Sequence, residues 1–309
     1  MKNRISNSNK VEHIATISDL HKNLKLAKPL HPLVSLIKLD TLKFDEFETD
    51  LRFSYGFYTV SLKRGIKNKI HYGHRSYDFD EGVLALIKPY QVMEFRHSPE
   101  DNTSGWILAF HPDFLSGYPL SKKIGTYGYF SYQVNEALHL SDKEEHQLLE
   151  LVQQLHDEYS VRIDSFSQEV MVLQIDLLLS FVNRFYNRQF LTRKKNNTDI
   201  LSKLDAHLDD YFDNGHAYDN GLPSISLLTT HLSVSPSYLN DLITSLTGRS
   251  SRDYIQRTII QKAKLNLSLT SKSVSEIGYK LGFQHSQSFN KFFKKHTSIS
   301  PGEYRKSVV

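Results

Sequence analysis

Residues 273–297 read SVSEIGYKLGFQHSQSFNKFFKKHT, the pattern of two short helices joined by a tight turn. Ser273 and Glu276 have the spacing of a capping box, which begins a helix by satisfying two backbone N–H groups. Gly282 follows where that helix must stop, because glycine adopts positive φ without steric cost. Phe289 and Phe293 then recur at helical spacing. We therefore predict a helix-turn-helix in this stretch.

Residues 224–246 repeat the same plan. Ser235 is placed to cap a helix, and Pro236 follows at the first helical position, where its missing N–H is harmless. Gly248 can end that helix in the left-handed conformation. Residues 251–269 between the two copies carry the apolar seam of one long helix. Because a helix-turn-helix places its second helix in a DNA major groove, two copies joined by one helix predict a rigid reader of two grooves.

The second helix of each unit leaves polar side chains outside its apolar stripe. Amide side chains can bond adenine bidentately in the major groove, and lysines neutralise phosphates, so we expect these side chains to contact DNA. The candidates in the first unit are Ser235, Ser237, Tyr238, Asn240, Asp241 and Thr244. The candidates in the second unit are Gln284, Ser286, Gln287, Asn290, Lys291 and Lys294. A solvated helix face is the alternative, and Tyr238 also suits packing against the core.

The basic residues gather towards the carboxyl end of the chain. Residues 249–306 hold twelve lysines and arginines against three acidic residues, a net charge of +9. The rest of the chain must carry −5 to give the total of +4. A basic end on an otherwise acidic chain fits contact with a polyanion, and a solvated basic face is the competing interpretation.

Together these motifs resemble the DNA-binding domain of AraC/XylS-type transcriptional regulators. The resemblance rests on residues 236–239 (PSYL), 247–248 (TG), 273–277 (SVSEI), 281–283 (LGF), 289–295 (FNKFFKK) and 300–305 (SPGEYR). Gly278 stands where the family usually has alanine, and Ser298 where it usually has glycine. His285 replaces a common acidic or small polar residue, and Ile259 an arginine of many members. These departures affect stability and specificity rather than the fold.

The resemblance implies that both reading helices lie on one side of the DNA, in successive major grooves about one helical turn apart. It also implies an N-terminal cupin-like barrel that senses a small molecule or dimerises. We therefore expect a sequence-specific transcriptional regulator that binds double-stranded DNA, contacts RNA polymerase and is controlled by a small-molecule effector. Activation and repression both stay open, because they depend on polymerase contacts and on operator position.

Residues 33–110 alternate short apolar and aromatic runs with turn residues, which is typical of a small antiparallel barrel or sandwich. The expected strands are 33–39, 53–62, 69–72, 83–87, 91–95 and 106–110. Residues 1–30 are polar, and we expect them to be loosely ordered. The predicted fold class is α+β with two domains. The N-terminal one is a cupin-like antiparallel β-barrel with an αα-hairpin, and the C-terminal one is all-α, with two helix-turn-helix units joined by a linker helix.

Residues 141–190 predict the αα-hairpin, begun by a capping box of Ser141 and Glu144. The apolar stripes are Leu148, Leu151, Val152, Leu155 and Tyr159 in the first helix, and Val170, Leu173, Leu177, Leu178, Phe181 and Phe185 in the second. Either the barrel or a second subunit must cover these stripes, so a homodimer through the helices is one of two expectations. We place the sensing and dimerisation domain at 1–190, a polar linker at 191–199 and the DNA-binding domain at 200–307.

Four side chains of the barrel region are candidates for effector contacts: His71, Arg75, His97 and Trp106. His71 and His74 are three residues apart, and such positions on a strand point to opposite faces, so they do not form a metal-binding pair. Phosphate-binding loops, nucleophile elbows and zinc-binding helix motifs are absent, and the chain has no cysteine nucleophile. We therefore expect no catalytic residue, no metal and no cofactor.

Two other functions compete with the regulator. One is a cupin-type metalloenzyme fused to a DNA-binding domain, which the missing metal triad disfavours. The other is a DNA-binding protein that works without an effector. The polar N-terminus lacks a signal peptide, and the apolar runs are shorter than the ~20 residues of a membrane span. We therefore expect a cytoplasmic protein, located at the nucleoid through DNA, with no membrane partner.

Overall fold

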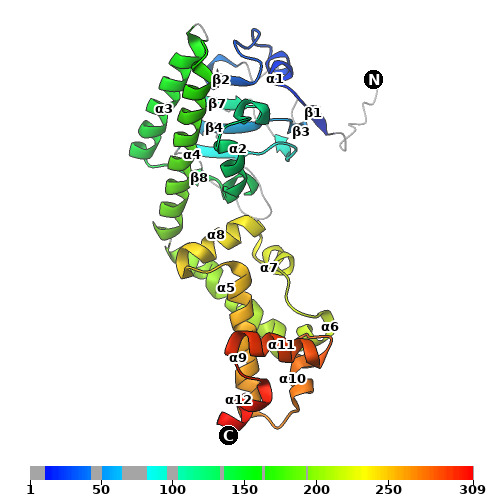
Figure 1. Cartoon of the computed structure of the whole chain (residues 1–309). Helices are drawn as coiled ribbons and strands as arrows, with labels where there is room; N and C mark the ends of the chain where they lie inside the picture. The colour runs from blue at the N-terminus through cyan, green and yellow to red at the C-terminus, as the bar shows by residue number, and fades with distance from the viewer. Residues whose placement is uncertain are drawn as a thin grey trace, which may run out of the picture. The chain divides into compact units, whose positions relative to one another are not determined.

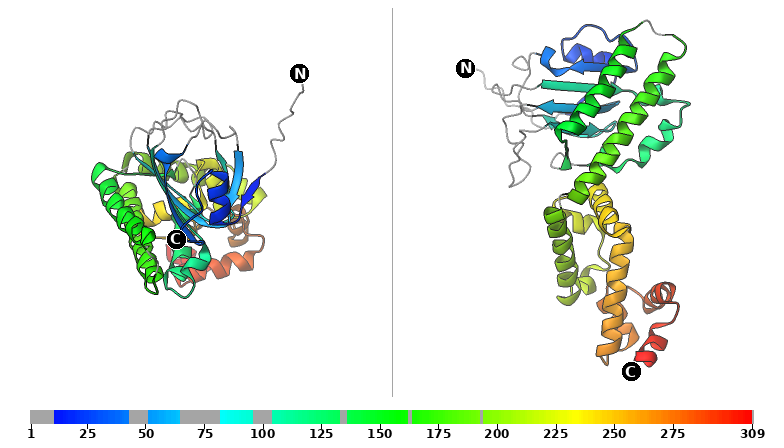
Figure 2. Two further views of the ribbon diagram at one scale, coloured as in Figure 1. Left: turned by 90° about the horizontal axis from the view of Figure 1, so that it is seen from above. Right: turned by 90° about the vertical axis from the view of Figure 1, so that its left-hand side faces the viewer.

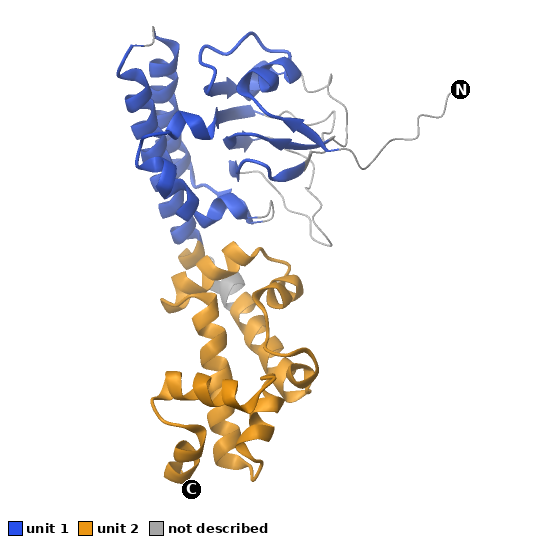
Figure 3. Ribbon diagram, turned by 45° about the vertical axis from the view of Figure 1, so that its right-hand side comes forward, with its two compact units in different colours: residues 1–189 blue, residues 190–309 orange. Residues whose placement is uncertain are grey.

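The computed structural model describes residues 11–42, 51–64, 82–95, 104–132, 136–161, 164–192 and 194–308. The chain divides into two compact units, Met1–Gln189 and Phe190–Val309, coloured blue and orange in Figure 3. Unit 1 combines β-sheets with a helical hairpin, and the described part of unit 2 is helical.

Unit 1 holds two β-sheets (Figure 1). The larger has the strand order β2 (Val34–Lys38), β7 (Ser104–Phe110), β4 (Tyr58–Arg64), β5 (Val83–Ile87) and β8 (Leu138–His139), with all neighbours antiparallel. The smaller has the order β1 (Glu12–Ile14), β3 (Leu51–Tyr55) and β6 (Val92–Phe95), with β1 parallel to β3. Short helices η1 (Leu39–Thr41), η3 (Pro112–Leu115), α2 (Leu120–Lys123), η4 (Ile124–Thr126) and η5 (Gly128–Ser131) connect these strands and β8.

The described strands between residues 33 and 110 lie where the sequence predicts them, while β1 and β8 lie outside the predicted strands. The expected strand 53–62 is two strands, because the chain turns at Gly56, where a Cβ would collide with the carbonyl oxygen of Ala15. Within the described ranges the two sheets stay open, so the expected closed barrel is not seen there. Hydrophobic periodicity shows which segments extend, but it does not determine which sheet edges pair. The expected strand 69–72 lies outside the described residues.

Residues 11–30 are more ordered than the sequence predicts. Strand β1 pairs with β3, and helix α1 (Ile17–Asn23) follows it. The Thr16 hydroxyl caps this helix by accepting a hydrogen bond from the backbone N–H of Asp19 at 3.1 Å. Ile17 and Leu20 are buried in the core of unit 1, together with Ile14, Ile37, Phe57 and Ala109. Three buried apolar side chains, Ile14, Ile17 and Leu20, therefore anchor this mostly polar segment in the core.

The predicted αα-hairpin is formed by α3 (Asp142–Ser160) and α4 (Ser167–Thr192), which lie side by side across the strands in the right-hand view of Figure 2. The capping box of Ser141 and Glu144 is confirmed, and Arg188 of α4 donates to the Glu144 carboxylate at 2.7 and 2.8 Å. The α3 stripe is buried as predicted.

Unit 1 covers only part of the apolar stripe predicted for α4. Leu178 and Phe185 are buried, but Val170, Leu173 and Leu177 are exposed. The side chains that α4 buries instead are Met171, Val172, Ile175, Leu179, Val182 and Tyr186. Because α4 is apolar on nearly every face, periodicity could not select the face that packs on unit 1.

Unit 2 begins with helices α5 (Lys194–Asp213) and α6 (His216–Asn220). The first helix-turn-helix is α7 (Ile225–Leu232) and α8 (Pro236–Thr247), and α9 (Ser251–Leu269) leads to the second, α10 (Val274–Lys280) and α11 (Ser286–Thr297). Helix α12 (Pro301–Val308) closes the chain. The expected linker at 191–199 is mostly helical, since α4 runs to Thr192 and α5 starts at Lys194; lysine and arginine are good helix formers despite their polarity.

Helix α5 is fastened to α9 by polar contacts. The Tyr254 hydroxyl donates to Asp205 at 2.7 Å, and the Lys262 ammonium lies 2.9 Å from both Asp209 and Asp213. Burial disfavours the ammonium, but its hydrogen bonds to the two aspartates outweigh this and raise the pKa of Lys262. These contacts fix α5 along one side of α9.

The second helix-turn-helix also meets the end of α6 through bare backbone. Gly282, at φ 93°, lies in the turn between α10 and α11. A Cβ there would stand 2.6 Å from the carbonyl carbon of Gly221 and 2.9 Å from the carbonyl oxygen of Ala217. Only glycine permits this approach, so the turn of the second unit is held against the segment that leads into the first.

Candidate nucleic-acid interface

Helix α11 presents the polar face that the sequence predicts. The capping box of Ser273 and Glu276 and the positive φ of Gly282 are confirmed, so the turn places α11 as expected. Phe289 and Phe293 are fully buried beneath the helix. The exposed candidates are Gln284, Gln287, Asn290, Lys291 and Lys294, while Ser286 is half-buried. This arrangement leaves amide and ammonium groups free of the core on one face of α11.

Two of the six candidates on the first unit have structural roles instead. Ser235 is buried and accepts a hydrogen bond from the backbone N–H of Tyr238 at 3.1 Å, as an N-cap. The Tyr238 ring is buried and meets the edge of Phe190, with ring centroids 5.2 Å apart. Burial corrects the expectation that these side chains contact DNA, and the remaining candidates of α8 are Ser237, Asn240, Asp241 and Thr244.

Asn240 and Thr244 also form bonds within unit 2. The Asn240 side-chain oxygen accepts from the backbone N–H of Ser251 at 3.1 Å and from its hydroxyl at 3.3 Å. The Thr244 hydroxyl donates to the carbonyl oxygen of Arg249 at 3.1 Å. Both bonds fix the short turn between α8 and α9, a role that the sequence analysis missed because the partners lie beyond the helix.

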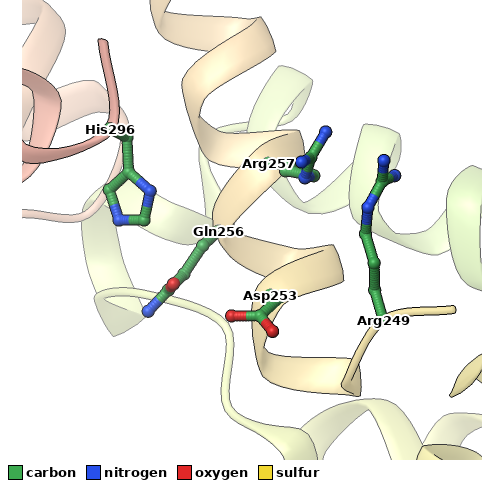
Figure 4. Close-up of a pocket in the computed structure, with 5 residues that line it drawn as sticks. All are labelled: Arg249, Asp253, Gln256, Arg257 and His296. Atoms are coloured by element: carbon green, nitrogen blue, oxygen red, sulfur yellow. The ribbon is translucent and has the colours of Figure 1, made fainter. Parts of the chain in front are cut away.

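Helices α8 and α11 both lie across the long α9, one beyond the other along its length (Figure 1). Between them is a notch of about 210 Å³, lined by Arg249, Asp253, Gln256, Arg257 and His296 and shown in Figure 4. In the sequence, the two arginines stand out only through the net charge of residues 249–306. The residues that line the notch come from the turn after α8, from α9 and from α11, which are brought together only in the folded chain.

The four side chains predicted to contact an effector belong to unit 1. His71, Arg75 and His97 lie outside the described residues. Trp106 is buried in β7 beside Leu62 of β4, on the opposite face to Ile107, which packs on the core of unit 1. Its indole nitrogen is buried without a hydrogen-bond partner among the described residues.

The described residues include no group of three or more His, Asp or Glu side chains placed to hold a metal ion. None of the helices that they form is long and apolar enough to cross a membrane.

Comparison with known proteins addresses the helical unit. A model of a helix-turn-helix domain matches residues 228–307. The arabinose operon regulatory protein of Escherichia coli is 35% identical over 81 residues, which are 26% of this chain and 28% of that protein. Residues 228–307 are an AraC-type helix-turn-helix domain.

Other relatives of this AraC-type domain are also named as regulators. The raffinose operon transcriptional regulatory protein of Pediococcus pentosaceus is 33% identical over 81 residues, 26% of this chain and 29% of that protein. An uncharacterised HTH-type transcriptional regulator of Staphylococcus aureus is 26% identical over 180 residues, 54% of this chain and 22% of that protein. The chain thus spans less than a third of the length of these relatives. Their names agree with the prediction of a regulator rather than an enzyme.

One solved structure is also similar to this chain in sequence. The C-terminal domain of the response regulator yesN from Fusobacterium nucleatum is 27% identical, and the match covers 33% of this chain and 96% of that one with a TM-score of 0.28. A TM-score this low supports no structural conclusion, so the assignment of the AraC-type domain rests on the sequence matches.

Proposed function

We propose that this chain is a sequence-specific transcriptional regulator whose helices α8 and α11 enter two successive major grooves of double-stranded DNA. The observation that carries the proposal is the exposed polar face of α11, opposite two buried phenylalanines, in an AraC-type domain. Asn290 and Gln287 suit adenine, since an amide can donate to N6 and accept at N7 with one side chain. Lys291 and Lys294 suit the flanking phosphates.

The test uses a duplex selected by the wild-type chain from a random pool. We expect the double variant Gln287→Ala with Asn290→Ala to lose roughly 10- to 100-fold of its preference for the selected duplex over random DNA, the value of a good bidentate contact. Gln261→Ala is the control, because Gln261 is an exposed amide on α9, outside both reading helices. An unchanged preference in the double variant would remove these side chains from base recognition.

Small-molecule control is the second part of the proposal. Thr59, Ser61 and Lys63 share one face of β4, and cross-strand partners Ala109 and Ile107 place this face toward the core of unit 1. Burial lowers the pKa of Lys63, as expected for an ammonium partly withdrawn from water. Hydroxyls beside a half-buried cation suit an effector with hydroxyl or anionic groups. Arabinose and raffinose, taken from the names of the relatives, are the first probes for a ligand-dependent rise in melting temperature.

Self-association through α4 is the third part. Phe166, Val170, Leu173 and Leu177 are 67%, 37%, 61% and 46% exposed, at the spacing of one helical stripe. A two-fold dimer pairs the same patch from both copies, so an apolar stripe is complementary to itself. Leu173→Lys should convert a dimer to a monomer in sedimentation, while Leu269→Lys, on α9 and more exposed than Leu173, should not. A wild-type monomer at micromolar concentration would exclude this part.

Contact with RNA polymerase and action at the chromosome in the cytoplasm complete the proposal. The regulator names of the relatives support them. Footprinting of the selected duplex inside a promoter, with and without polymerase, is the measurement; no extended footprint with both proteins would argue against the contact.

A further inference from the structure

The notch on α9 is built from the ends of both reading helices. Arg249 follows directly after α8, and its carbonyl oxygen is held by the Thr244 hydroxyl. Asp253, Gln256 and Arg257 come from the first turns of α9, and His296 from the last turn of α11. The notch therefore occupies the interval that separates the two helices expected to enter DNA.

Its charge is positive and available to a ligand. Arg249 and Arg257 are exposed, and neither forms an ion pair in the part of the chain that the structure describes. Figure 4 shows their guanidinium groups pointing the same way. The single carboxylate, Asp253, is held by the Ser250 hydroxyl at 2.8 Å as part of the cap of α9. Lys262, further along α9, is by contrast already neutralised by two aspartates.

The notch lies on the side of α9 away from Lys262 and its aspartates. Helix α5 bonds to Tyr254 and Lys262. At about 100° per residue, Asp253 and Gln256 lie roughly opposite to Lys262, while Arg257, three residues after Tyr254, lies between these two sides. Asp253 is exposed and Gln256 is half-buried.

We propose that Arg249 and Arg257 bind a phosphate of the DNA backbone that lies between the two major grooves, with His296 at the edge of the same notch. The inference rests on the proposed function. Between successive major grooves, each strand carries its phosphates past the minor groove, and guanidinium groups bind phosphate oxygens bidentately. Such a contact carries no base information; it fixes where the duplex lies relative to both reading helices.

The experiment compares the full chain with the double variant Arg249→Gln, Arg257→Gln and with the control Arg252→Gln, an exposed arginine of α9 outside the notch. Affinity for the selected duplex is measured against salt. We expect the double variant to reduce the slope of log affinity against log salt by about one, the value of one phosphate contact, with its base preference intact. The control should keep the wild-type slope or lose less than the double variant.

Ethylation of single phosphates locates the contact. Ethylation between the two footprinted grooves should weaken the wild type and have no further effect on the double variant. A double variant with the wild-type slope and the wild-type ethylation pattern overturns the inference. Inorganic phosphate provides a second check. If it stabilises the wild type but not the double variant, while both have the same slope of log DNA affinity against log salt, the notch is a small-anion site and the inference is overturned.

The outcomes separate this inference from the proposed function. If the wild type selects no sequence from the random pool, the proposed function fails and the notch has no DNA to bind. If the wild type selects a sequence and the double variant binds it as tightly at every salt concentration, only the phosphate contact fails. Circular dichroism melts of the double variant and the control show that both are folded.

Discussion

Replacing Gly282 by alanine should damage the helical unit far more than its size suggests. The substitution adds one methyl group at φ 93°, where L-residues are strained, and places it 2.6 Å from the backbone of Gly221. Left-handed backbone costs about 1–2 kcal/mol for a residue with a Cβ, and overpacking a close contact costs a further ~1–3 kcal/mol. The unfolded chain loses some entropy, which returns ~0.4–1 kcal/mol. We therefore expect a net loss of about 2–4 kcal/mol.

Gly215 supplies the matched control. It also has positive φ, at 83°, but a Cβ there meets no atom within 4 Å. Gly215→Ala should therefore show the backbone cost without the collision, about 1 kcal/mol or less. The difference between the two variants isolates the contact with Gly221.

Urea unfolding followed by circular dichroism measures these losses, and melting should fall by roughly 10–20 °C for Gly282→Ala. DNA binding provides a second readout. Because the contact holds the second helix-turn-helix against the segment that leads into the first, Gly282→Ala should weaken binding to a duplex with both half-sites more than to a duplex with one. Equal losses of stability in the two glycine variants would refute the reasoning from the close approach.

Three further outcomes follow from the polar contacts of unit 2. Hydrogen bonds to its aspartates raise the pKa of Lys262 above 10.5, so the stability that the ammonium gives is present at neutral pH and is lost as pH rises through the raised pKa. In Lys262→Met, the urea midpoint of unfolding should therefore depend less on pH in the alkaline range than it does in the wild type. Hydrogen bonds from the Ser273 hydroxyl and N–H lower the pKa of Glu276, so the start of α10 should lose protection from hydrogen exchange as pH falls below 4.5. Ser273→Ala should weaken this dependence without abolishing it, because the backbone N–H still donates to the carboxylate. Asn240→Ala should cost about 1 kcal/mol by uncapping α9, while Asn240→Asp, which keeps the acceptor, should restore most of it.

Local signals were the most predictable part of this fold. A capping box needs two residues three positions apart, so Ser141 with Glu144 and Ser273 with Glu276 could be identified without knowledge of the tertiary structure. A glycine that ends a helix can also be identified from neighbouring residues alone, and Gly248 has φ 70° as expected. The helical unit was predictable because its helices are short and each is bounded by such signals.

Tertiary partners explain the failures. The amphipathic face of α4 could not be chosen because Leu173 and Met171 are equally apolar, and only the neighbouring elements decide which is buried. The polarity of Asn240 suggested a reading residue, but Ser251, eleven positions later, accounts for its side-chain oxygen. The burial of Ile17 and Leu20 depends on strands that follow them in the sequence.

The candidate DNA site divides in the same way. Helical spacing from Phe289 and Phe293 placed Gln287, Asn290 and Lys291 outside the core, because a helix that buries two residues must turn the intervening ones outward. The notch could not be predicted, since its five residues come from three segments that only the folded chain brings together.

The aspartates of α5 have a consequence for how this domain meets a duplex. Asp205, Asp209 and Asp213 hold negative charge on one flank of α9, while Arg249 and Arg257 hold positive charge on the other. Charge separated in this way gives the domain a dipole moment, on which the field of a polyanion exerts a torque before the surfaces touch. Collisions that begin with the acidic flank forward are rotated toward the productive orientation, and added salt shortens the range over which this happens.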